Sequence, residues 1–166
     1  MKRLAAMVAV LALLGGFAFA QDPIRIGVNL ELSGRMAVTG NDTLYGIQVA
    51  LSQQPTVLGR MVELSVCDNA STVEGSVACA NRFVDEGVVA VLGSYSTSHT
   101  IPAAQVLQPA GVLLVSTGST NPATTQIGDY IFRIPYTDQF QGAMAAQYAY
   151  NDVGARNVAI FRQQDD

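Results

Sequence analysis

Residues 88–107, VVAVLGSYSTSHTIPAAQVL, run from an apolar stretch through a polar loop into a helix. Residues 88–92 form a continuous apolar run, which is typical of a parallel strand covered on both faces. Pro102 lacks a backbone N–H and is tolerated only near the start of a helix, so the first helical turn must lie around residues 97–102. A strand followed at once by a helix is half of a β-α-β unit, and it indicates an α/β fold.

The same alternation continues on both sides of this unit. Apolar residues recur at helical spacing in three further segments, for example at Phe140, Met144 and Tyr148. Repeated β-α-β units are connected by right-handed crossovers. The sequence therefore predicts one doubly wound, mostly parallel sheet in three α/β/α layers. Further strands are expected at residues 24–30, 62–67, 112–115, 130–134 and 158–161.

Composition narrows the classes of function. The 166 residues are 49% hydrophobic and 13% charged, which predicts one ordinary folded domain with a buried core. Nine Lys and Arg stand against 13 Asp and Glu, with no basic cluster after residue 3, so we expect no nucleic-acid partner. One His and two Cys exclude a His-rich or four-Cys metal site, and we expect no metal.

The first 20 residues have the pattern of a secretory signal peptide. Lys2 and Arg3 precede an apolar run that closes on Ala18-Phe19-Ala20. The alternative is a membrane anchor, but about 17 apolar residues interrupted by two glycines are short for a span of roughly 20. We expect cleavage after Ala20 and a periplasmic or secreted mature protein.

The loop after the strand at 88–92 has the character of a carboxylate site. Ligands of doubly wound sheets bind outside the carboxyl ends of the strands. Here free N–H groups at a helix start are flanked by hydroxyls, which suits an anion. Simple N-capping is the alternative, since Ser and Thr are preferred caps. The density of hydroxyls favours anion binding, with five in seven residues: Ser94, Ser96, Thr97, Ser98 and Thr100.

The loop after the next strand, residues 116–122, is STGSTNP. Its carbonyls and hydroxyls suit an ammonium group, and Gly118 permits a tight turn or close approach to a ligand. An ordinary β-turn would use the same residue types. Together the two loops offer a carboxylate pole and an ammonium pole, which is the pattern of a site for a zwitterion.

Three further side chains near these loops carry ionisable groups. Glu31 and Arg35 follow the first strand. Glu31 could act as a base and Arg35 as an anion ligand, but we expect both to form a solvated rim. His99 could act as a general base beside Ser96 or Ser98, which would make the protein an exported hydrolase. No G-x-S-x-G turn frames either serine, so we expect His99 to be a surface residue and the protein not to be an enzyme.

The two cysteines are Cys67, at the end of a predicted strand, and Cys79, in the following helix. An exported protein meets an oxidising environment that permits disulfides. A bridge requires Cα atoms within about 7 Å, and packing of a helix on a strand makes this borderline. A disulfide and two separately buried thiols both remain possible.

At these residues the chain resembles the periplasmic branched-chain amino-acid-binding proteins, the leucine/isoleucine/valine-type receptors that feed ABC importers. The resemblance covers residues 24–166 and implies the first lobe of a type I periplasmic binding protein. It rests on IRIGV at 24–28, LSG at 32–34 with Gly40 and Gly46, CDN at 67–69, VLG at 91–93, VSTGSTNP at 115–122 and FR at 132–133.

The resemblance implies a function without catalysis or cofactor. Two lobes would close over an amino acid, branched-chain or otherwise aliphatic, and deliver it to a membrane permease of an ABC importer. Tyr95, Ser96 and Thr97 would hold the ligand carboxylate, through backbone N–H groups and the Thr97 hydroxyl. Ser119 and Thr120 would contact the ammonium and assist with the carboxylate.

One position departs from the family pattern. Thr39 stands where these receptors tend to place an aromatic wall residue, and we expect it to line the site. Receptors for amides, urea or aromatic acids of the same superfamily are the alternative within binding proteins, and a ligand-sensing receptor domain is a further one.

The expected organisation is a signal peptide at 1–20 and the first ligand-binding lobe at 21–137. Residues 138–166 would be a connecting helix, at 139–151, and the first strand of a second lobe that is otherwise missing.

Overall fold

The computed structural model describes residues 22–161, so the signal peptide predicted at residues 1–20 lies outside the described part. Six strands form one sheet in the order β2-β3-β1-β4-β5-β6. All neighbouring strands are parallel except β2 and β3, which form an antiparallel hairpin. The strands are β1 (Ile24–Leu30), β2 (Thr56–Val57), β3 (Arg60–Asp68), β4 (Ala90–Gly93), β5 (Leu113–Ser116) and β6 (Ile131–Arg133).

The strand order confirms the predicted doubly wound, mostly parallel sheet. The chain adds β3 on one side of β1 and then returns to place β4 on the other side. The sheet therefore has its topological switch point between the carboxyl ends of β1 and β4. The loops that leave these two strands begin at Glu31 and Ser94, which places them side by side.

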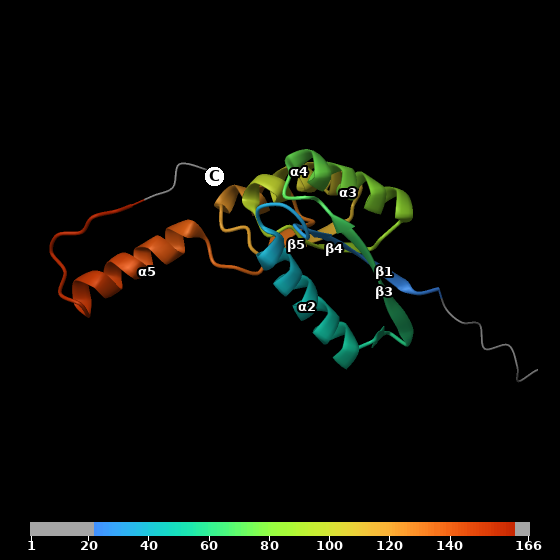
Figure 1. Cartoon of the computed structure of the whole chain (residues 1–166), viewed down its shortest axis with the longest axis horizontal. Helices are drawn as coiled ribbons and strands as arrows, with labels where there is room; N and C mark the ends of the chain where they lie inside the picture. The colour runs from blue at the N-terminus through green and yellow to red at the C-terminus, as the bar shows by residue number, and fades with distance from the viewer. Residues whose placement is uncertain (1–21, 162–166) are drawn as a thin grey trace, which may run out of the picture.

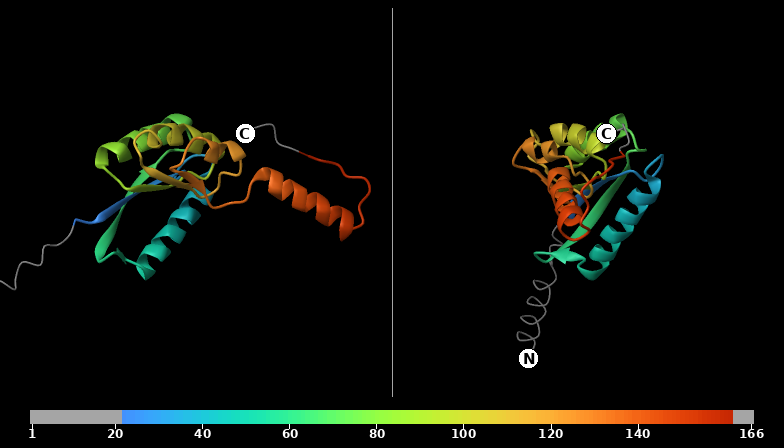
Figure 2. Two further views of the ribbon diagram at one scale, coloured as in Figure 1. Left: turned by 180° about the vertical axis from the view of Figure 1, so that it is seen from behind. Right: turned by 90° about the vertical axis from the view of Figure 1, so that its left-hand side faces the viewer.

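Helices cover both faces of the sheet, as expected for three layers (Figure 1). Helices α3 (Val73–Glu86) and α4 (Thr97–Leu107) lie together on one face, and α2 (Ala37–Gln53) lies on the other, as the view from behind also shows (Figure 2). A 3-10 helix, η1 (Pro122–Gln126), precedes β6, and α5 (Asp138–Asn151) follows it.

The core lies between the sheet and the α3–α4 layer. Phe83, Val91, Leu107 and Leu114 are fully buried there. The ring of Phe83 rests directly on Gly27 of β1, where an added Cβ would lie 2.8 Å from the ring carbon Cγ. Burial of such an aromatic side chain contributes about 1.5–3 kcal/mol, so the glycine lets the central strand accept the main anchor of α3.

Cys67 of β3 and Cys79 of α3 form a disulfide. Their Cα atoms are 5.8 Å apart, which is within the range that a disulfide requires. Of the two alternatives for these cysteines, the structure contains the bridge. It ties α3 to an outer part of the sheet, 12 residues earlier in the chain.

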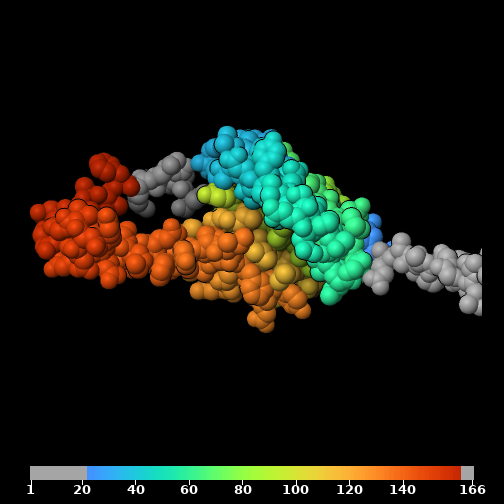
Figure 3. Space-filling model, turned by 90° about the horizontal axis from the view of Figure 1, so that it is seen from below, coloured from blue at the N-terminus to red at the C-terminus, as the bar shows by residue number. Residues whose placement is uncertain are grey.

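The opposite face is less completely covered. A groove of about 570 Å³ lies between α2 and the sheet, with an apolar lining that includes Ile26, Ile47, Leu51 and Leu64. Figure 3 views the molecule from this side, with α2 and the β2–β3 hairpin in cyan to green next to the yellow and orange segment that ends in β6.

Helix α5 projects away from the sheet, as Figure 1 and the left-hand view of Figure 2 show. None of its residues is buried, and the apolar positions Phe140, Met144 and Tyr148 are about half exposed or more, at 50%, 48% and 63%. Across residues 22–161, no helix combines the length and the apolar character that a membrane span needs.

The strand expected at residues 158–161 is not formed, and this prediction was wrong. A strand requires a neighbour for its backbone hydrogen bonds, and no other strand of the described chain pairs with these residues. Val158, Ile160 and Phe161 are accordingly 72%, 88% and 97% exposed. The two-residue strand β2 was not predicted, because two residues are too few for an alternating pattern.

Candidate functional site

The loop after β4 turns into α4 as the sequence predicted. Ser96 is the N-cap residue and Thr97 begins the helix, with Pro102 in its second turn. The N–H groups of His99 and Thr100 donate to the carbonyl of Ser96, at 3.2 and 3.0 Å. The N–H groups of Thr97 and Ser98, in the first turn, are therefore the donors of α4 that remain without a helical acceptor.

A pocket of about 400 Å³ lies at this helix start. It brings together the loops after β4 and β5 and the start of α5. The residues that line it all carry polar or charged groups: Thr97, Ser98, Thr120, Asn121 and Asp138. The structure thus places Thr97 and Thr120, one from each predicted pole, on the same cavity.

The two threonine hydroxyls in this pocket are available for a ligand. Thr97 and Thr120 are half-buried, and neither hydroxyl has an intramolecular hydrogen-bond partner among residues 22–161. Together with the N–H groups at the start of α4, they form a cluster of donors at the positive end of a helix dipole, which favours an anionic group.

Asp138 supplies the opposite charge. Its carboxylate is in the first turn of α5, and its backbone N–H donates to the carbonyl of Thr120 at 3.1 Å. A carboxylate and a carbonyl close to hydroxyl donors can bind an ammonium group. Sequence reasoning missed Asp138, because an acidic residue after the cap Thr137 reads as ordinary helix capping, and the helix was expected to begin at residue 139.

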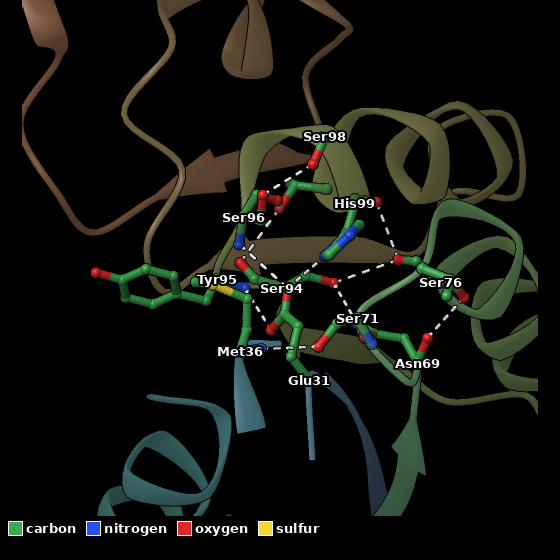
Figure 4. Close-up of polar contacts among 12 residues, drawn as sticks. Glu31, Met36, Asn69, Ser71, Ser76, Ser94, Tyr95, Ser96, Ser98 and His99 are labelled. Carbon is green, nitrogen blue, oxygen red and sulfur yellow. Dashed lines mark hydrogen bonds and ion pairs between the residues drawn. The ribbon is translucent and has the colours of Figure 1, made fainter. Parts of the chain in front are cut away.

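Glu31 is not part of a solvated rim, and this prediction was wrong. Its side chain is fully buried, next to the loop after β4 (Figure 4). One carboxylate oxygen, Oε2, accepts the N–H of Tyr95 at 3.1 Å, and Oε1 accepts the N–H of Ser96 at 3.2 Å. Burial of a carboxylate is costly unless such donors satisfy it, which explains why two backbone N–H groups turn toward Glu31.

His99 is likewise buried rather than at the surface, which corrects the prediction for this residue. Only 6% of it is exposed, and its Nδ1 lies 2.8 Å from Oε1 of Glu31. The Ser98 hydroxyl pairs with the Ser96 hydroxyl at 2.9 Å and makes no hydrogen bond with the imidazole. Arg35 is exposed, as a rim residue should be.

These contacts change the roles expected of two ligand residues. The N–H groups of Tyr95 and Ser96, which the resemblance assigned to a ligand carboxylate, already donate to Glu31. The ring of Tyr95 packs instead on the neighbouring loop, where an added Cβ at Gly118 would lie 2.4 Å from its Cδ2. Gly118 is thus required for close contact between the two loops.

Ser119 also differs from expectation, because its side chain is fully buried and does not line the pocket. Its hydroxyl accepts from the Ser116 hydroxyl and donates to the Thr100 hydroxyl, both at 2.7 Å. The Ser119 side chain therefore links the two loops through hydrogen bonds and is not free to contact an ammonium group.

Thr39 does not line the pocket that contains Thr97 and Thr120. It lies on α2, half-buried, and its carbonyl accepts from the Thr43 hydroxyl at 2.9 Å. Among residues 22–161, no group of three or more His, Cys, Asp or Glu side chains is arranged to hold a metal ion.

A polar pocket at the carboxyl edge of a doubly wound sheet is characteristic of α/β ligand-binding domains. The chain belongs to the periplasmic binding protein family, which it matches over residues 23–166. The resemblance noted in the sequence is confirmed.

Individual relatives agree with this assignment. The chain is 30% identical over 163 residues to the Leu/Ile/Val-binding protein homolog 1 of Brucella abortus, with 96% of this chain and 43% of the relative covered. It is 35% identical to a leucine-binding protein from Thermotoga maritima, with a TM-score of 0.76 and coverage of 80% of this chain and 38% of that one.

A third similar protein is the solute-binding protein of an ABC transporter from R. palustris, solved in complex with 4-hydroxybenzoate. It is 30% identical, with a TM-score of 0.72 and coverage of 79% of this chain and 36% of the other. The chain spans about two fifths of the length of the relatives it matches. All three similar proteins are binding proteins, and the third belongs to an ABC transporter, which supports a solute-binding role.

Proposed function

We propose that the protein is an extracytoplasmic solute-binding protein that captures an amino acid, branched-chain or otherwise aliphatic, for an ABC importer. The carrying observation is the pocket at the carboxyl edge of the sheet, which Thr97 and Ser98 at the start of α4 line together with Asp138. Donors on one side and a carboxylate on the other match the two charges of an amino acid.

In this proposal the ligand carboxylate binds at the start of α4. The N–H groups of Thr97 and Ser98 and the Thr97 hydroxyl donate to it, and the Thr120 hydroxyl assists. The ligand ammonium binds near the Asp138 carboxylate, with the Thr120 carbonyl as a further acceptor. This differs from the first expectation, since Tyr95 and Ser96 hold the loop and do not hold the ligand.

The remaining parts of the proposal follow the family. A second lobe would close over the ligand from the side that the pocket leaves open, and the membrane permease of an importer would receive the ligand. The signal-peptide pattern at residues 1–20 and the family's name support a periplasmic or secreted location.

The second candidate is a receptor for an aromatic acid. The relative that binds 4-hydroxybenzoate is as similar to this chain as some amino-acid receptors are, and an aromatic carboxylate would also fit the donors of α4. Such a ligand has no ammonium group, so Asp138 would then face an uncharged part of it. A carboxylate in that position favours the amino acid.

A calorimetric titration of the complete polypeptide tests the proposal. We expect saturable binding of L-leucine, L-isoleucine or L-valine, and weak or no binding of 4-hydroxybenzoate. Binding of the aromatic acid with no response to any of the 20 amino acids would replace the first proposal with the second. Hydrolysis of a bound amide or ester would revive the hydrolase alternative.

A further inference from the structure

Glu31 occupies the topological switch point of the sheet. It is the first residue after β1, and the three groups that contact its carboxylate all belong to the segment after β4. In doubly wound sheets the crevice between these two strand ends is where ligands usually bind. In this protein a side chain of the chain itself fills part of that crevice with a carboxylate (Figure 4).

The carboxylate of Glu31 acts as a cap for the start of α4. Ser96 is in the N-cap position, but its side chain makes no capping hydrogen bond to α4. Glu31 instead accepts the N–H groups of Tyr95 and Ser96, just before the helix, and pairs with the ring of His99 in the first turn. A negative group at this end of a helix is favourable for the same reason that a bound anion is.

This arrangement divides the donors between protein and ligand. The two N–H groups that precede the helix donate to Glu31, and the next two belong to Thr97 and Ser98, which line the pocket. The position of a ligand carboxylate is thereby restricted to the start of the helix. If Glu31 did not hold the preceding residues, the loop could turn these donors in other directions.

We propose that Glu31, with His99 as its partner, is a positioning residue of the ligand site, which fixes the start of α4 so that Thr97 and Ser98 present their donors to a ligand carboxylate. The proposal rests on the proposed function of this pocket. Neither Glu31 nor His99 lines the pocket, so both act through the loop they hold and not through contact with the ligand.

The fold does not depend on this pair alone. The carbonyl of His99 accepts from the Ser76 hydroxyl at 2.9 Å, and the Ser94 hydroxyl accepts from the side-chain amide of Asn69 at 3.2 Å. These buried bonds anchor both ends of the loop to α3 and to the end of β3. Loss of the Glu31 carboxylate should therefore disturb residues 95–98 and leave the sheet and α3 intact.

The first experiment compares Glu31→Gln with the unmodified complete polypeptide, with L-leucine as the probe in a calorimetric titration. Glutamine keeps the size of the side chain but replaces one acceptor oxygen with an NH₂ group, which opposes a backbone N–H. We expect affinity to fall about tenfold, because a buried donor is left unsatisfied. Glu63→Gln is the matched control, since Glu63 is an exposed carboxylate on β3 that pairs with Arg25 at 3.5 Å. It should bind leucine normally.

The second comparison uses the partner. Asparagine can place its side-chain amide near the position of Nδ1, so His99→Asn should retain most of the affinity. Leucine is similar in size to histidine but is apolar, so His99→Leu removes the Nδ1 donor to Glu31. This variant should lose about as much affinity for L-leucine as Glu31→Gln. Equal affinity in both His99 variants would overturn the role of the pair.

Amide hydrogen exchange separates failure of this proposal from failure of the proposed function. In Glu31→Gln without ligand, the amides of Tyr95 and Ser96 should exchange at least about tenfold faster, while those of β1 and β4 stay unchanged. Unchanged protection at Tyr95 and Ser96, or faster exchange with unchanged leucine affinity, would overturn the positioning role. If the unmodified protein binds no amino acid, the proposed function fails, and the exchange rates still decide whether Glu31 holds the loop.

Discussion

The backbone N–H of Asp138 donates to the carbonyl of Thr120 at 3.1 Å, which joins the start of α5 to the loop after β5. This bond places Asp138 at the pocket that Thr97 and Ser98 also line. The site is thus assembled from three segments that are separated by about 20 residues each in the sequence, and the sheet brings them together.

The two pocket threonines give the first prediction. In the complete polypeptide, Thr97→Ala and Thr120→Ala should each weaken L-leucine binding by about 1–3 kcal/mol, because a charged ligand group loses a hydrogen bond. Thr56→Ala, in β2 and remote from the pocket, should have no effect on binding. Calorimetry that finds all three variants equal to the unmodified protein would remove the zwitterion site.

Asp138 gives a second prediction, about the ammonium pole. Asp138→Asn should lower affinity for L-leucine about threefold to tenfold, because the exposed carboxylate is partly screened by water. Affinity for the corresponding 2-hydroxy acid, which lacks the ammonium group, should change little. The matched control is Asp152→Asn, just past the far end of α5. A loss of equal size for both ligands would show that Asp138 acts on the loop and not on the ammonium group.

The elements of the fold could be predicted where they depend on local pattern. Apolar stretches of strand length predicted five of the six strands, and Pro102 with its preceding hydroxyls located the start of α4. The strand at 158–161 was wrongly predicted from the same kind of run, because a run of apolar residues does not reveal whether a partner strand is present.

The roles of Glu31 and His99 could not be predicted in this way. A charged residue directly after a strand reads as exposed, and only its contacts decide otherwise. Those contacts come from residues 64 to 68 positions later in the chain, so no local pattern contains them. Thr97 and Thr120 were predictable, since each belongs to a hydroxyl-rich loop at the carboxyl end of its own strand.

The disulfide gives a third prediction, about stability. A Cys67→Ser, Cys79→Ser double variant should be less stable than the oxidised protein by about 2–4 kcal/mol, because the bridge restricts the unfolded chain. Urea unfolding of both proteins measures the difference. Addition of reductant should lower the stability of the unmodified protein and leave the double variant unchanged. Two thiols that react with an alkylating reagent in native protein would contradict the bridge.

Asp68 gives a prediction about pH. Partial burial acts to raise the pKa of this carboxyl, but hydrogen bonds from the Ser33 side chain and from the N–H groups of Ala70, Ser33 and Leu32 outweigh it, so its pKa lies below the ordinary value. A lowered pKa in the folded state contributes stability above the unfolded pKa of about 3.9. This contribution is lost as pH falls through the folded value.

Two measurements check the behaviour of Asp68. An NMR titration of its carboxyl carbon should give a midpoint below about 3.9. Asp68→Asn should lose less stability than the unmodified protein as pH falls through this range. A midpoint at or above the ordinary value would mean that the hydrogen bonds to Leu32, Ser33 and Ala70 are not maintained in solution.

The last prediction concerns affinity of residues 21–166 alone. Sites for small molecules usually cover roughly 70–90% of the ligand surface. Five residues line the pocket described here. Under the proposed two-lobe capture they would contact the charged end of an amino acid, and its aliphatic side chain would remain against water. Each Å² of apolar surface left exposed to water lowers the binding free energy by about 25 cal/mol.

We therefore expect this segment to bind L-leucine in the millimolar range or more weakly, which corresponds to a binding free energy of about 4 kcal/mol or less. The complete polypeptide should bind far more tightly. The exposed helix α5 should also exchange its amides faster in the segment than in the complete polypeptide, since no residue of α5 is buried here. Micromolar binding by residues 21–166 would mean that this lobe alone encloses the ligand, and the two-lobe proposal would then be abandoned.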